Sequence, residues 1–157
     1  MDRLSWCFGL RDGLRITEPN EKLSREYLEQ AKSSLLRAEK DLDDGDLLWS
    51  TVAMYYAEYY ALYSFLQRIG IKCENHSCSI FVVGFLTGPE KVRIINRHKD
   101  KRIDAQYYMK VGQEGRIREM LREAKEFVSE FDELVSGLTE RDIALHMERI
   151  IKAKDKL

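Results

Sequence analysis

The segment from Lys91 to Arg102 holds the one strong charge asymmetry in this chain. Six of its residues are Lys or Arg, at positions 91, 93, 97, 99, 101 and 102, and one is acidic, Asp100. Arginine presents a planar fork of donors to phosphate oxygens, and the imidazole of His98 can exchange a proton near neutral pH. The segment therefore predicts a phosphate site for a nucleotide or RNA, with a solvated helix face as the equally weighted alternative.

The basic segment ends in a motif, Arg-x-Asp-Ala-x-Tyr, that runs from Arg102 to Tyr107. On a helix this spacing brings a fixed cation, a carboxylate and a phenol together within about one and a half turns. Asp104 either belongs to the binding site or pairs with Arg102 or Lys101 to fix the helix, and we favour the pairing.

A tyrosine-rich helix is expected to position this motif. Large apolar side chains recur every three or four residues, the period of one buried helix face. They are Leu48, Val52, Tyr55, Tyr59, Leu62 and Leu66. Alanines and further tyrosines fill the other faces, so residues 46–69 should form the central helix of a bundle. Its tyrosines are interpreted as core and dimer-face aromatics rather than as a platform for stacked bases. Glu58 is expected to pair with Arg102, because an unpaired buried carboxylate is costly.

The rest of the chain carries the periodicity and capping signals of further helices. We expect them over residues 20–44, 76–86, 87–99 and 116–136, followed by a last helix from Thr139. Only two prolines and nine glycines interrupt the chain, and 34% of its residues are charged, a composition that favours long solvated helices.

Short connections between such helices indicate an all-α fold, an up-and-down four-helix bundle with an additional short helix and a C-terminal helix. Residues 1–20 are expected to be an N-terminal extension that packs on the bundle. Residues 21–136 should form the bundle itself, and residues 139–157 the C-terminal helix of the same domain.

Length and charge limit the possible functions. A chain of 157 residues fits one domain with one sizeable core. A formal net charge of −1 argues against a globally basic nucleic-acid binder, so any such role must be local. The longest uncharged stretch, residues 75–89, is too short and too polar to span a bilayer, and no apolar run marks a secretory signal. We therefore expect a soluble, cytoplasmic protein with no membrane partner.

Cys7, Cys73 and Cys78 are odd in number and lack the paired spacing of zinc motifs. We expect buried free thiols rather than a disulfide framework or a structural zinc site. A metal cluster of Cys73, His76 and Cys78 is an alternative of lower weight. No metal and no cofactor is expected.

Four sequence segments together resemble the HEPN family, small helical bundles named for higher eukaryotes and prokaryotes nucleotide-binding. The resemblance covers roughly residues 23–135. It rests on Tyr-Leu-Glu-Gln-Ala-Lys at 27–32, Tyr-Tyr-Ala at 55–57, the Asn75-His76 turn and the motif from Arg102 to Tyr107. The resemblance implies the helical bundle expected above.

HEPN ribonucleases carry an Arg followed four to six residues later by a His, thought to hold the scissile phosphate and to assist attack by the 2′-hydroxyl. Here Tyr107 stands where that His would follow Arg102. A phenol with an ordinary pKa of about 10 is a poor base at neutral pH. The motif resembles instead the variant found in HEPN proteins paired with minimal nucleotidyltransferases, although Ala105 and Gln106 replace the usual Ala-Asp order. By this resemblance Tyr107 or Tyr108 would accept a nucleotidyl group, whereas otherwise each is a packed aromatic.

The leading hypothesis is a homodimeric HEPN protein that acts beside a minimal nucleotidyltransferase in a toxin–antitoxin-like system. It would bind nucleotide or RNA in a basic cleft at the two-fold axis. The residues assigned to the cleft are Arg97, His98, Lys101, Arg102, Asp104 and Tyr107. The second hypothesis is a non-enzymatic module that binds a nucleotide or a protein. The third is a metal-independent ribonuclease in which Arg102 and His98 are catalytic.

Overall fold

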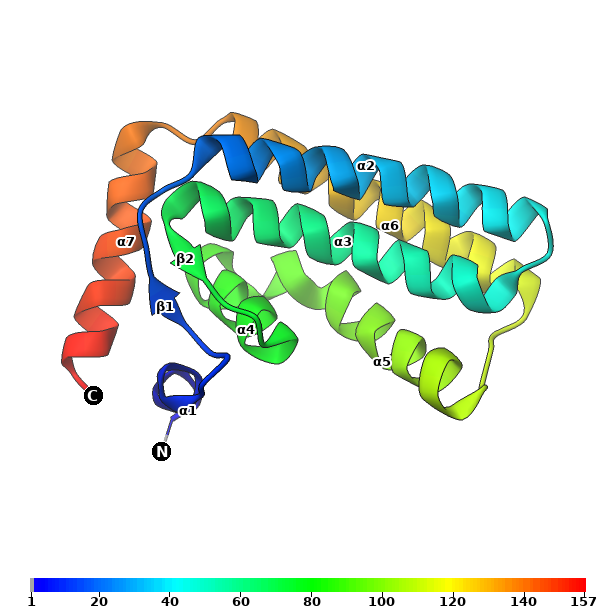
Figure 1. Ribbon diagram of the computed structural model, residues 1–157, viewed down its shortest axis with the longest axis horizontal. Coiled ribbons are helices and arrows are strands. Elements are labelled where there is room, and N and C mark those ends of the chain that lie inside the picture. The colour runs from blue at the N-terminus through cyan, green and yellow to red at the C-terminus, as the bar shows by residue number, and fades with distance from the viewer. Residues whose placement is uncertain (1) are drawn as a thin grey trace.

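Four long helices lie side by side and enclose the core. In the computed structural model, which describes residues 2–157, they are α2 (Glu21–Asp43), α3 (Leu47–Ile69), α5 (Arg93–Tyr108) and α6 (Glu114–Ser136) (Figure 1). Three follow expected segments, whereas the helix expected over residues 87–99 is instead a 3-10 turn over 89–92 and a helix over 93–108. The short helix α4 (His76–Thr87) and a 3-10 turn, η1 (Pro89–Val92), connect α3 to α5. The predicted all-α bundle is confirmed.

Side-chain caps fix where these helices begin and end. Asn20, Asp46 and Asn75 each accept a hydrogen bond from a backbone N–H in the first turn of the helix that follows. α3 ends at Gly70, which has a φ of 90°. A β-carbon at that glycine would meet the carbonyl oxygen of Thr17 at 2.7 Å, so both the conformation and the close approach require glycine.

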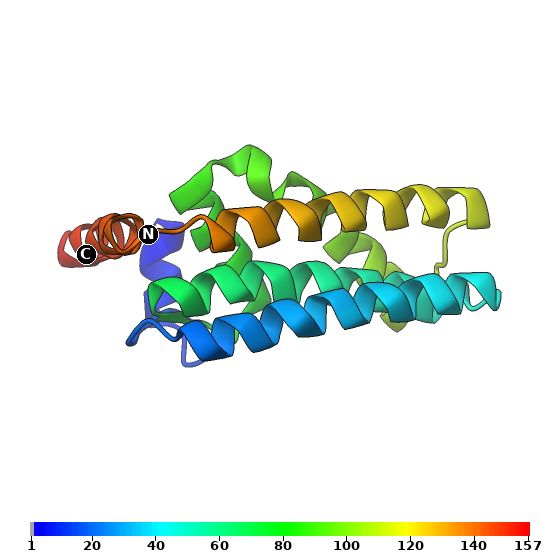
Figure 2. The same cartoon turned by 90° about the horizontal axis from the view of Figure 1, so that it is seen from above.

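α3 is the central element, because it touches every other helix of the bundle. Its side chains are buried on nearly all faces, including Tyr55, Leu62 and Phe65, none of which is accessible to solvent. α2 and α6 pack along its whole length, while α4 and α5 cover it from another side (Figures 1 and 2). Apolar residues are distributed around all faces of this helix, and for this reason its sequence predicted the central helix of the bundle.

The last helix, α7 (Glu140–Asp155), begins with a reciprocal capping box between Thr139 and Asp142. It crosses the end of the bundle where α2 begins and α6 ends, and Figure 2 shows it nearly end-on there. The N-terminal helix α1 (Arg3–Gly9) packs against α4 and α7, and the two-residue strand β1 (Arg15–Ile16) pairs antiparallel with β2 (Ile71–Lys72). Residues 3–16 therefore contact both the C-terminal helix α7 and, in the middle of the chain, β2 and α4.

One expectation about the cysteines is wrong. Cys7 of α1 and Cys78 of α4 form a disulfide across 71 residues of sequence, and only Cys73 remains a buried free thiol. Packing of α1 on α4 places the two Cα atoms 5.7 Å apart, within the range that a disulfide requires. Nothing in the spacing of the cysteines indicated that these two helices meet.

Candidate functional site

Helix α5 presents three different faces, and each one carries part of the predicted site. Ile95, His98, Arg102 and Ala105 are buried, at the period of a face that packs inward. Arg97, Lys101 and Asp104 lie on a flank that looks toward α6, and Tyr107 and Tyr108 are exposed at its C-terminal end. The sequence-predicted residues therefore share one helix but not one cleft within a single protomer.

Arg102 is a nearly buried cation that stacks on aromatic rings. Its side chain is 7% exposed, and its guanidinium carbon lies 4.7 Å from the centre of the Tyr55 ring, 5.7 Å from Tyr56 and 5.9 Å from Tyr107. One guanidinium nitrogen donates to the side-chain oxygen of Gln106 at 3.3 Å, whereas the Nε is buried without a partner. Among residues 2–157 no carboxylate lies within salt-bridge distance of Arg102.

His76 joins this arrangement from the first residue of α4. Its Nδ1 is 2.9 Å from the hydroxyl of Tyr55, and its ring stacks on Tyr59 at a centroid distance of 3.8 Å. Burial, together with the nearby charges of Arg102 and Lys99, lowers the pKa of His76 to about 4. The imidazole is therefore neutral at pH 7, as expected where fixed cations already create a positive potential.

The sequence assigned His76 to a cap or turn, with the metal cluster as the alternative of lower weight. Asn75 is the cap. His76 contacts the hydroxyl of Tyr55, and the guanidinium of Arg102 lies over the ring of the same tyrosine. The two residues belong to different helices, so no spacing rule connects them. The available signal was the Asn75-His76 pair at the start of a short helix, which indicates a helix start and nothing about its neighbours.

The expected pair of Glu58 and Arg102 is wrong, because Glu58 pairs with His98 instead. His98 is 1% exposed, its Nδ1 lies 2.9 Å from Oε1 of Glu58, and its Nε2 lies 3.7 Å from Oε1 of Glu123 on α6. Glu123 also forms an ion pair with Arg97. His98 and Arg102 are one helical turn apart on the same face, and the position of α5 along α3 decides which of them meets Glu58.

Glu58 is completely buried, and this burial raises its pKa to about 7, although the hydrogen bond and charge of His98 act in the opposite direction. One Glu58 oxygen, Oε2, has no hydrogen-bond partner. Arg97, His98, Glu123 and Glu58 thus form a connected set that holds α5 against α3 and α6. His98 makes its contacts inside the bundle rather than at its surface.

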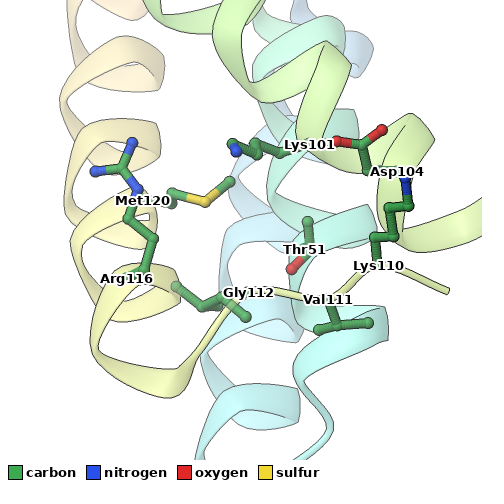
Figure 3. Close-up of a pocket in the computed structure, with 9 residues that line it drawn as sticks. Thr51, Lys101, Asp104, Lys110, Val111, Gly112, Arg116 and Met120 are labelled. Carbon is green, nitrogen blue, oxygen red and sulfur yellow. The ribbon is translucent and has the colours of Figure 1, made fainter. Parts of the chain in front are cut away.

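Lys101 and Asp104 line a pocket of about 230 Å³ between the end of α5 and the beginning of α6 (Figure 3). Figure 3 shows Lys110 and Val111 entering it from the connecting loop, and Arg116 and Met120 from α6. Three cations and one carboxylate thus surround this pocket: Lys101, Lys110, Arg116 and Asp104. Lys101 and Asp104 form no ion pair with each other, so the favoured structural role of Asp104 as a partner of Lys101 or Arg102 is not observed.

Tyr107 and Tyr108 are 65% and 66% exposed. Neither hydroxyl forms a hydrogen bond to any of the residues that the structure describes. Tyr107 lies on the side of Arg102, and both phenols are accessible to another molecule. Neither is a packed aromatic.

A model of the HEPN domain family matches residues 24–134 of this chain, which is the bundle without its N-terminal extension and α7. Searches of curated proteins and of solved structures found no match. Within residues 2–157, no helix combines the length and the apolarity needed to cross a bilayer. No group of three His, Cys, Asp or Glu side chains in these residues is arranged to hold a metal ion.

Proposed function

The chain belongs to the HEPN domain family, and we propose that it binds the phosphate of a nucleotide or RNA at Arg102. In this proposal it acts as a homodimer, the two copies of α5 line a shared basic cleft, and a minimal nucleotidyltransferase is its partner in a toxin–antitoxin-like system. The observation that carries the proposal is a nearly buried Arg102 with no carboxylate partner among the described residues.

A guanidinium withdrawn from water without a counter-ion is costly, and a bound phosphate would supply the missing charge and hydrogen bonds. The positively charged side chains near Arg102 also favour a bound anion. Burial and the nearby charges of Arg3 and Arg102 lower the pKa of Lys99, and His76 is kept neutral. Lys101 adds a further ammonium on the neighbouring face of α5.

The remaining predicted residues take different parts in this proposal. Tyr107 lies beside the guanidinium, and Asp104 adds a hydrogen-bond acceptor to a region that is otherwise cationic. Arg97 is already paired with Glu123, so its contribution to phosphate binding is the smallest. His98 acts as a positioning residue, because its contacts hold α5 rather than face a ligand. The ribonuclease alternative would need His98 at the substrate, and its 1% exposure counts against that role.

The test is the affinity of the purified dimer for a short single-stranded RNA, measured for wild type, Arg102→Ala and Arg102→Lys. Loss of a charge-assisted hydrogen bond to phosphate costs roughly 1.5–3 kcal/mol, which is about 10- to 100-fold in affinity. We expect that loss for Arg102→Ala, with a shallower dependence on salt concentration. Arg141→Ala, which removes an exposed arginine on α7, is the control. Equal affinity of Arg102→Ala and wild type at several salt concentrations would rule out Arg102 as the phosphate ligand.

The proposed partner would transfer a nucleotidyl group to Tyr107 or Tyr108. The phenolic oxygen attacks the α-phosphorus of a nucleoside triphosphate, pyrophosphate leaves, and the phenolic proton passes to solvent. The exposure of the Tyr107 and Tyr108 side chains supports this role. Co-expression with a nucleotidyltransferase encoded beside this chain should add the mass of a nucleotide, and Tyr107→Phe together with Tyr108→Phe should prevent it. An unchanged mass of the wild-type chain would contradict this part of the proposal.

A further inference from the structure

A second cavity, distinct from the one in Figure 3, opens between the start of α2, the second half of α3 and the segment that joins β2 to α4. Its volume is about 420 Å³, within the range of roughly 300–1,000 Å³ common for small-molecule sites. We call it the tyrosine pocket. It is lined by Leu23, Tyr27, Tyr59, Tyr60, Tyr63, Gln67, Lys72, Cys73, Glu74 and His76.

Aromatic rings form the wall of the tyrosine pocket in a fixed arrangement. Tyr59 stacks between Tyr63, at a centroid distance of 5.8 Å, and His76, at 3.8 Å. Tyr27 of α2 lies 5.9 Å from Tyr60 and meets Tyr63 edge-on at 5.0 Å. Tyr59 and Tyr63 are at least 90% buried, whereas Tyr27 and Tyr60 are only half-buried, and all four line the cavity.

Such a wall does not resemble a packed core. Core aromatics bury their rings against neighbours on all sides, but here Tyr27 and Tyr60, which stack on each other, also border an open cavity. The side chains of Lys72 and Glu74 stand at the rim as a weak ion pair, 3.6 Å apart and largely exposed. They offer a hydrogen-bond donor and an acceptor, the two kinds of group found on the edge of a nucleobase.

Side-chain contacts of His76 and Tyr55 connect the tyrosine pocket to the Arg102 site. His76 lines the pocket on one side, and its Nδ1 meets the hydroxyl of Tyr55, over whose ring Arg102 lies, on the other. Stacking surfaces next to a cation are the combination by which proteins hold unpaired nucleotides, because every base has a π-face and every nucleotide has a phosphate.

We propose that the tyrosine pocket binds one unpaired nucleobase, whose sugar-phosphate backbone continues past His76 toward Arg102. This inference rests on the proposed function and adds to it the recognition of a base. The ligand class is a nucleotide, either free or within single-stranded RNA. The aromatic residues of α3, which their spacing alone assigned to the core and a dimer face, divide between two roles: Tyr55 and Tyr59 support the site from within, and Tyr60 receives the base.

The test compares two short single-stranded RNAs that differ only in one abasic position, with AMP and ribose 5-phosphate as the corresponding small probes. Removing a base-stacking aromatic typically costs about 1–3 kcal/mol, so Tyr60→Ala should weaken binding of the intact RNA at least about 10-fold. The affinity for the abasic RNA should not change. Tyr60→Phe keeps the ring and should bind like wild type. Trp49→Ala removes an exposed aromatic of the same helix outside the pocket and should have no effect.

The outcomes separate this inference from the proposed function. If Arg102→Ala binds both RNAs as well as wild type does, the phosphate site fails. If Arg102→Ala weakens both RNAs while Tyr60→Ala weakens neither, the phosphate site stands and the base pocket is overturned. Loss of dimerisation in Tyr60→Ala, with equal loss for intact and abasic RNA, would also overturn it, because a second copy would then cover the pocket.

Two further readouts complete the experiment. A Tyr60-dependent affinity for AMP, but not for ribose 5-phosphate, supports a free nucleotide, whereas dependence seen only with RNA supports a strand. Should Tyr60→Ala fail to fold by circular dichroism, Tyr27→Ala carries the same expectation from the facing helix, since both rings are half-buried at the same cavity.

Discussion

His98→Ala is expected to lower the free energy of unfolding by about 3–5 kcal/mol, the cost of leaving a buried carboxyl group without its hydrogen-bonded partner. The side chain of Glu58 is 0% exposed, and His98 is its hydrogen-bond partner at 2.9 Å. Without the imidazole, Glu58 keeps the full cost of burial and must bind a proton or draw water into the core. Urea unfolding of wild type and variant, followed by circular dichroism, measures the difference.

The pH dependence of this loss has a definite sign. Burial raises the pKa of folded Glu58 from 4.5 to about 7, so the folded protein holds this proton more tightly than the unfolded chain does. The stability that this carboxyl contributes is fully present below pH 4.5 and is lost as the pH rises through 7. In His98→Ala the imidazole no longer opposes the rise in the pKa of Glu58, so the loss of stability extends to higher pH. The variant should therefore be more stable, relative to wild type, at pH 5 than at pH 8.

Glu58→Gln is the matched control, because it keeps the shape and a hydrogen bond to His98 but cannot carry charge. Glu58→Gln should lower the free energy of unfolding less than His98→Ala does. His98→Ala should also lower it less in the Glu58→Gln background than in wild type. Strictly additive effects in this double-mutant cycle would show that the two side chains do not act as a pair.

Reduction of the disulfide between Cys7 and Cys78 should lower the free energy of unfolding by up to about 4 kcal/mol. The bond closes a loop across 71 residues, and a loop of that length limits the entropy of the unfolded chain by about this amount. It also ties α1 to α4, so proteolysis should release the N-terminal segment once the bond is reduced. Denaturation midpoints with and without reductant give the magnitude.

Cys7→Ser should reproduce the effect of reductant and make the protein insensitive to it, whereas Cys73→Ala should leave the sensitivity intact. Cys73 forms no disulfide, and its thiol is buried. Labelling of the denatured, unreduced protein should find one thiol. Three labelled thiols, together with equal midpoints in both conditions, would show that the bond does not form.

The helices could be predicted from the sequence because their signals are local. Asn20, Asp46 and the Thr139 capping box each satisfy backbone donors within three residues of themselves. The burial of α3 follows from its composition, and the burial of Arg102 on the inner face of α5 is consistent with Ile95 and Ala105 on the same side. Glu58 is also paired inside the bundle, as the cost of an unpaired buried carboxylate implies, although its partner is His98 rather than Arg102.

The site itself depended on how the helices are placed against one another. Arg102 and His98 share one face of α5, and only the register between α5 and α3 pairs His98, rather than Arg102, with Glu58. The approach of His76 to Tyr55, the contact of Cys7 with Cys78 and the cavity in front of Tyr60 each join segments that are distant in the sequence.

The amino-acid sequence by itself determined the long helices α2, α3 and α6, their caps and the family, because capping and periodicity act within a few residues. Only the tertiary structure decided which polar groups meet inside the bundle and which aromatic rings remain open. Those contacts depend on the rotation and displacement of whole helices, and the packing of all the side chains together sets these quantities.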